Sequence, residues 1–113
     1  MDQALQAAIE AVISQTYASA APPQTEGLYA VWRRIGGEPM EYLDNAEPQV
    51  SHALVQVEVW GGDVLQVKEG IHQLAGSLRG HAELVIRPNA GFRDGYDADM
   101  KLFSASQDFD VWG

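Results

Sequence analysis

The three histidines are the residues of this chain best suited to metal or proton chemistry. They are His52, His72 and His81, and none has a second histidine or a carboxylate placed to share one helix face as a ligand pair. Glu69 precedes His72 by three residues, but a single pair of this kind is typical of a surface contact. The spacing therefore predicts no metal site.

Three aspartates lie close together in the segment Arg-Asp-Gly-Tyr-Asp-Ala-Asp. They are Asp94, Asp97 and Asp99. A calcium loop needs alternating oxygen ligands and a bidentate acid further along the chain. The alternation is wrong here and no glutamate follows at the required distance, so we expect a solvated acidic turn.

The chain lacks the residue combinations that nucleophilic catalysis usually requires. Ser51 and His52 are adjacent in an expected strand, so their side chains point to opposite faces and cannot act as nucleophile and base. The chain has no cysteine, no Gly-x-Ser-x-Gly elbow, and no glycine-rich phosphate or dinucleotide loop. No carboxylate pair has the apolar surroundings that raise a pKa for acid catalysis. We expect no enzyme activity and no cofactor.

The composition describes a small acidic domain. The 113 residues include 7 basic and 16 acidic side chains, which gives a formal charge of −9. Such a chain repels nucleic-acid backbones and anionic membranes. No apolar run reaches the roughly 18–20 residues of a membrane span. We expect no signal or transit peptide, because the first residues carry no basic region and Asp2 and Glu10 interrupt them. We expect one domain over residues 1–113, of cytoplasmic origin.

Two helices are expected. Apolar residues recur at intervals of three and four over residues 2–17, where Asp2 can cap the first turn. A second stripe covers residues 64–79, with Asp63 as the N-cap and Gly80 at the C-terminal position that favours a left-handed residue. Gly70 lies within this second helix and would allow close approach of a sheet beneath it.

The rest of the chain reads as β structure with two long connections. The expected strands span residues 28–35, 50–60, 83–87 and 100–112, and residues 92–97 form either a short strand or an irregular arm. An extended connector covers residues 18–26, and a long acidic loop covers residues 36–49. This order predicts an α+β fold: a mostly antiparallel sheet of about four strands, with two helices packed on one face.

Large apolar side chains remain after the expected core is filled. The tryptophans fall on strand faces opposite those assigned to the core, and others lie in the long loop. Such residues mark an interface in a domain of this size, unless the loop or the segment 88–99 covers them as a second small core. The expected interface residues are Trp32, Met40, Tyr42, Leu43, Trp60 and Trp112.

Several of these segments together resemble the phage tail-completion, or tail-terminator, family. One is the run of residues 55–60 (Val-Gln-Val-Glu-Val-Trp) before a capped helix. A second is residues 29–32 (Tyr-Ala-Val-Trp), which lead through residues 34–36 to a loop with Pro39 and Leu43-Asp44. The third is the closing run of residues 108–112 (Asp-Phe-Asp-Val-Trp). Pro22-Pro23-Gln24 also matches the family's pattern before its first strand. The resemblance covers nearly the whole chain, except that residues 82–99 do not align.

The resemblance implies a structural and non-enzymatic role in the virion tail. Proteins of this family form a ring, usually hexameric, at the head-proximal end of the tail tube. The ring stops tube polymerisation and offers a surface to the head-completion or connector protein. DNA would pass through an acidic bore without specific binding, because a surface without Lys or Arg releases no counterions. The expected bore residues are Glu38, Glu41, Asp44 and Glu47, unless this loop is simply solvated.

Two other classes of function are compatible with the sequence. The same α+β pattern with exposed aromatic residues is compatible with a small-ligand or regulatory module that dimerises through its sheet. A hydrolase that uses aspartate and histidine is a further alternative, and it would require a pocket beside a histidine.

Overall fold

The computed structural model describes residues 2–37, 52–89 and 91–113. In this part of the chain there are two helices and six strands, and each helix is followed by three strands. The elements are α1 (Asp2–Glu10), β1 (Thr16–Ala18), β2 (Tyr29–Gly37), β3 (His52–Gly61), α2 (Val64–Arg79), β4 (Val85–Pro88), β5 (Arg93–Asp97) and β6 (Leu102–Trp112).

The strands form one sheet in the order β1-β2-β3-β6-β4, and β5 also pairs with β6. The two longest strands, β3 and β6, run antiparallel from the pair His52–Trp112 to the pair Gly61–Phe103. The other edge of β6 is shared, because β4 pairs with its C-terminal part and β5 with its N-terminal part. The short strand β1 is parallel to β2, and the remaining pairs are antiparallel. The α+β class and the mostly antiparallel sheet are confirmed.

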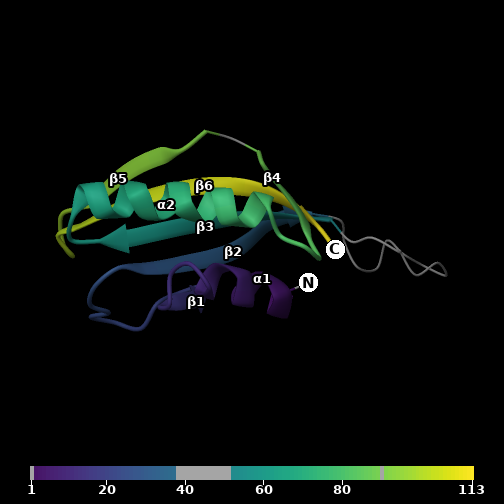
Figure 1. Ribbon diagram of the computed structural model, residues 1–113. Coiled ribbons are helices and arrows are strands. Elements are labelled where there is room, and N and C mark those ends of the chain that lie inside the picture. The colour runs from purple at the N-terminus through teal and green to yellow at the C-terminus, as the bar shows by residue number, and fades with distance from the viewer. Residues whose placement is uncertain (1, 38–51, 90) are drawn as a thin grey trace.

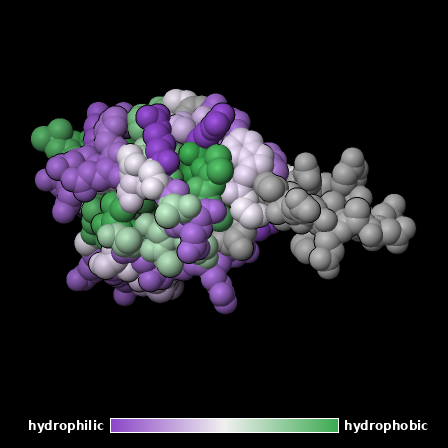
Figure 2. Space-filling view, turned by 45° about the vertical axis from the view of Figure 1, so that its right-hand side comes forward, coloured by the Kyte–Doolittle hydropathy of each residue, from purple (hydrophilic) through white to green (hydrophobic). Residues whose placement is uncertain are grey.

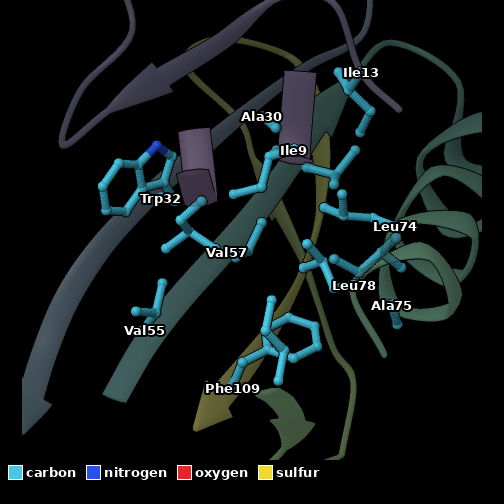
Figure 3. Close-up of a cluster of buried hydrophobic side chains, with 14 of the residues drawn as sticks. Ile9, Ile13, Ala30, Trp32, Val55, Val57, Leu74, Ala75, Leu78 and Phe109 are labelled. Atoms are coloured by element: carbon cyan, nitrogen blue, oxygen red, sulfur yellow. The ribbon is translucent and has the colours of Figure 1, made fainter. Parts of the chain in front are cut away.

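Both helices contribute to one core on the same side of the sheet. Figure 1 shows α2 lying along β3 and β6 and α1 lying near β1 and β2. The valine face of β3 is fully buried, since Val55, Val57 and Val59 have no exposed surface. They pack with Ile9 and Leu74, among other helix residues (Figure 3). The predicted core face of β3 is therefore confirmed, because the opposite face carries polar side chains that favour solvent.

The second helix has the predicted bounds and N-cap. One carboxylate oxygen of Asp63 accepts hydrogen bonds from the backbone N–H groups of Leu65 and Gln66, at 2.9 and 3.3 Å. The prediction of a left-handed residue at Gly80 is wrong, because its φ is −91°. The helix closes instead with two i to i−3 hydrogen bonds, from the N–H groups of Gly80 and His81. This tighter last turn requires no left-handed residue.

The first helix is shorter than predicted. It ends at Glu10, and Thr16 begins β1 instead of continuing the helix. The backbone N–H of Ala30 donates to the carbonyl of Gln15 at 2.8 Å, so pairing with β2 takes over at this point. Ile13 and Thr16 are nevertheless buried. The apolar periodicity therefore persists through a turn that is no longer α-helical.

The predicted number of about four strands is too low. The segment 92–97, which was ambiguous, contains β5, and β1 was not expected at all. A strand of three residues such as β1 carries too little pattern to be recognised on its own. Strand β2 also extends through Gly36 and Gly37, which were expected to end it.

Candidate assembly surface

The side of the sheet opposite the helices carries a surface that we call the open face. Side chains alternate across a strand, so the residues that are out of phase with the buried valines lie on this side. The open face comprises Tyr29, Val31 and Arg33 of β2, His52, Leu54, Gln56, Glu58 and Trp60 of β3, and Leu102, Ser104, Ser106, Asp108, Asp110 and Trp112 of β6.

Two of the predicted interface residues lie on the open face, near its opposite ends. Trp60 stands beside Tyr29 and Ser104 in the register, and Trp112 stands beside His52. Both tryptophans are half-buried. The indole N–H of Trp60 donates to Glu58 at 3.1 Å, and the ring of Trp112 lies 5.1 Å from that of His52. Their predicted placement on the uncovered face is confirmed.

The predicted placement of Trp32 on the uncovered face is wrong. Trp32 is opposite Val57 in the register and only 6% exposed, so it belongs to the core under α1. Its indole N–H donates to the side-chain oxygen of Gln6 at 2.5 Å (the ring is shown in Figure 3). This burial removes the basis on which Trp32 was expected to contact a partner.

The other predicted surface residues belong to the acidic loop that the sequence predicts over residues 36–49. They lie outside the described residues, and this holds for both the apolar interface set and the acidic bore set. The residues are Met40, Tyr42, Leu43, Glu38, Glu41, Asp44 and Glu47.

The middle of the open face is polar and crossed by ion pairs. Arg33 pairs with Glu58 at 2.9 Å, and Arg93 of β5 reaches Asp108 at 2.7 Å. The hydrogen bond to Asp108 raises the pKa of the Arg93 guanidinium. These pairs are partly solvent-exposed, so each contributes about 0–1 kcal/mol to stability. Their main effect is to align the side chains across neighbouring strands.

A third polar cluster lies near Trp112. The Nε2 atom of His52 lies 2.8 Å from one oxygen of Asp110, and the amide of Asn89 donates to the other oxygen at 2.8 Å. These hydrogen bonds, from Asn89 and then from His52, lower the pKa of Asp110 below its ordinary value of 3.8. The carboxylate therefore stays ionised under mildly acidic conditions and holds β3, β6 and the end of β4 together.

A groove of about 750 Å³ lies at the Trp60 end of the open face. One wall is the connector of residues 19–26, and the rest is formed by side chains of β2, β3, β6 and the turn before β6. Sequence reasoning missed this groove. Pro22-Pro23 indicated an extended connector, but nothing in the connector indicated that it would fold over Tyr29 and Val31, which it buries on the open face.

A second exposed cluster, also missed, lies where β5 approaches α2. The rings of His72 and Phe92 lie 4.4 Å apart, and those of Tyr96 and Phe103 lie 4.8 Å apart. Phe92 and Tyr96 are exposed. On the face seen in Figure 2, hydrophobic residues form small patches among hydrophilic ones. The apolar surface is therefore distributed over several elements.

The polar groups suited to chemistry are engaged in structural contacts. The Nδ1 atom of His81 accepts hydrogen bonds from the backbone N–H groups of Glu83 and Leu84. Asp97 accepts two backbone hydrogen bonds in the turn before β6, and Asp94 pairs with Lys68 at 3.4 Å. Within residues 2–37, 52–89 and 91–113, no three His, Asp or Glu side chains are grouped to hold a metal ion.

Comparisons with known proteins give structural matches alone. No family model and no curated protein matches the chain. A chain from the virion of a native gene transfer agent particle is similar over 98% of this chain and 89% of that chain, with a TM-score of 0.56 and 13% identity. The two therefore share a fold over almost their whole lengths.

Two structures from Akkermansia muciniphila also match. One is a crystal structure and the other was determined without a transmembrane region; the TM-scores are 0.48 and 0.47, at 12% and 11% identity. The matches cover 74% and 76% of this chain but only 40% and 44% of those chains. Among the described residues of our chain, neither helix is long and apolar enough to cross a membrane.

Proposed function

We propose that this protein is a structural component of a phage or prophage virion that completes the tail. It forms a ring at the head-proximal end of the tail tube, stops tube polymerisation and provides the surface that joins the head. It carries out no catalysis and needs no cofactor. The observation that carries the proposal is the shared fold with a virion chain of a gene transfer agent, over 98% of this chain and 89% of that one.

The two edges of the sheet support assembly into a ring. One edge is the short strand β1, and the other is shared by β4 and β5. A closed ring of identical subunits needs two different patches on each subunit that bind head to tail. Edges of unlike structure meet this requirement, whereas a symmetric dimer uses one patch twice. A hexamer is the ring size that the family resemblance suggests.

The strong negative charge suits a ring through which DNA passes. A formal charge of −9 disfavours lasting contacts with phosphates. In this proposal the loop residues Glu38, Glu41, Asp44 and Glu47 line the bore. The ring has two protein partners, the tail tube protein below it and the head-completion or connector protein above it.

Deletion of the gene in the producing strain tests this function. Negative-stain microscopy should then show tails of abnormal length or tails without heads. A plasmid copy of the wild-type gene should restore joined particles of normal length. Normal, head-joined particles from the deletion strain would contradict the proposal.

The oligomeric state separates this function from its main alternative. A regulatory or small-ligand module that dimerises through its sheet should be a tight dimer at micromolar concentration. A subunit that assembles on a tail should be monomeric alone and form a ring with tail tubes. Sedimentation velocity across a range of concentrations distinguishes the two, and a stable dimer would favour the alternative.

A further inference from the structure

The groove at the Trp60 end of the open face has walls that are held in place. The backbone N–H of Ser19 donates to the carbonyl of Trp32 at 2.8 Å, and the guanidinium of Arg33 donates to the carbonyl of Ser19 at 3.4 Å. At the far end of the connector, the amide of Gln15 donates to the carbonyl of Glu26 at 2.7 Å. The connector is thus tied to the sheet on both sides, and a preformed site loses less entropy when it binds.

The floor of the groove is apolar and aromatic. Tyr29 and Val31 lie at its base and are almost fully buried, whereas the Trp60 side chain beside them is only half-buried. Leu102 and Met100 close the side opposite the connector, and Met100 is 50% exposed. A volume of about 750 Å³ is within the range of roughly 300–1,000 Å³ that is usual for ligand sites.

The charged residues of the groove are mainly acidic. Glu26, Glu58 and Asp99 line it, against the single guanidinium of Arg33 among its lining residues, an excess of two negative charges. One oxygen of Glu58 binds Arg33 at 2.9 Å and the other accepts from the Trp60 indole at 3.1 Å. Burial raises the pKa of Tyr29, and the nearby charge of Glu58 raises it further. The groove therefore has a negative potential.

A cation is the ligand group that this combination attracts. An indole face binds ammonium and guanidinium groups within about 6 Å of its centre. Carboxylates beside the ring strengthen that attraction; Glu26 lines the groove from the connector and Asp99 from the turn before β6. Apolar side chains of a ligand would contact Met100 and Leu102. In an extended peptide, side chains two residues apart lie on the same face, so such a segment can present a cationic and an apolar group to the groove together.

We propose that this groove binds an extended segment, carrying lysine or arginine two residues away from an apolar residue, from another protein of the virion. The identity of the partner as a virion protein rests on the proposed function, while the chemistry of the segment rests on the groove alone. The cationic side chain stacks on Trp60 between the carboxylates, and the apolar side chain two residues away, which lies on the same face of the segment, packs against Met100.

Fluorescence anisotropy with labelled heptapeptides tests this proposal on the isolated full-length protein. One probe, Lys-Ser-Leu-Ser-Lys-Ser-Leu, places lysine and leucine on one face of an extended chain, and its matched control replaces both lysines with glutamate. The lysine probe should bind saturably and more weakly as salt rises, and the glutamate probe should not bind. The double variant Glu26→Gln, Asp99→Asn should weaken binding roughly fivefold, and Trp60→Ala should weaken it further.

A second double variant controls for net charge. Glu69→Gln with Glu83→Gln removes the same two charges from exposed positions outside the groove, and it should leave binding unchanged. Equal losses in both double variants, tight binding of the glutamate probe, or no saturable binding of the lysine probe would each overturn the proposal. Any of these results would overturn peptide binding by the groove but would not affect the proposed tail function. Normal particles from the deletion strain would overturn the tail function but would not affect the chemistry proposed for the groove.

Discussion

Replacement of Trp32 by alanine tests the assignment of the two sheet faces. Trp32 is 6% exposed and packs in the core between α1 and the valine face of β3. The change removes the whole indole from this layer. It also leaves the side-chain oxygen of Gln6 without the hydrogen bond that it accepts from the ring at 2.5 Å. Trp60→Ala is the matched control, because it removes the same side chain from the open face.

The expected cost for Trp32→Ala is about 4 kcal/mol, since truncation of a buried large aromatic residue costs roughly 3–5 kcal/mol. Domains have total stabilities of about 5–15 kcal/mol, so this variant should be close to unfolding. Trp32→Phe keeps most of the packing and should cost about 1–2 kcal/mol, mainly through the lost hydrogen bond. Trp60→Ala leaves the core intact and should cost about 1 kcal/mol.

Urea unfolding followed by far-UV circular dichroism measures these differences. With a slope of roughly 1–3 kcal/mol per molar urea, the midpoint for Trp32→Ala should fall by about 2 M and that for Trp60→Ala by about 0.5 M. The order of the two variants is the decisive result. If Trp60→Ala is destabilised as much as Trp32→Ala, the assignment of the covered and open faces is refuted.

Three further changes test local features of the fold. Asp63→Ala removes the N-cap of α2 and should cost about 1 kcal/mol in urea unfolding, whereas Asp63→Asn should cost much less. Gly76→Ala should stabilise the protein by up to about 1 kcal/mol, because a methyl group there meets nothing within 4 Å; a lower melting temperature would contradict this. Asn89 and His52 lower the pKa of Asp110 in the folded state below 3.8, so the folded state binds fewer protons than the unfolded state. The stability that the ionised Asp110 contributes is therefore present above about pH 4 and is lost as the pH falls below it. Melting temperatures of Asp110→Asn should therefore depend less on pH below about pH 4 than those of the wild type.

The sequence identifies the core face of β3 but not that of β2, for a physical reason. In β3 the buried valines alternate with Gln56 and Glu58, so only one face is apolar. In β2 both faces are apolar at the start, since Tyr29 and Val31 alternate with Ala30 and Trp32. All four are buried, because α1 and the connector cover opposite sides of the strand. Alternation alone cannot distinguish two covered faces.

The groove depends on contacts between distant parts of the chain. Its walls combine the connector of residues 19–26 with Trp60 and with the turn that precedes β6. No local pattern relates these segments. The end of α1 was missed for a similar reason, because pairing of the chain after α1 with β2 overrides a helical periodicity that continues to Thr16. By contrast, α2 has a clear stripe, a capping aspartate and a glycine beyond its last turn, so its bounds could be predicted.

We propose that this protein acts as a building block at one end of a tail. Cryo-electron microscopy can test this role by comparing particles from the producing strain with particles from the deletion strain. We expect ring-shaped density at the head-proximal end of the tail that fits this fold and is missing without the gene. Density of this fold along the length of the tube, or intact particles that contain none of the protein, would contradict it.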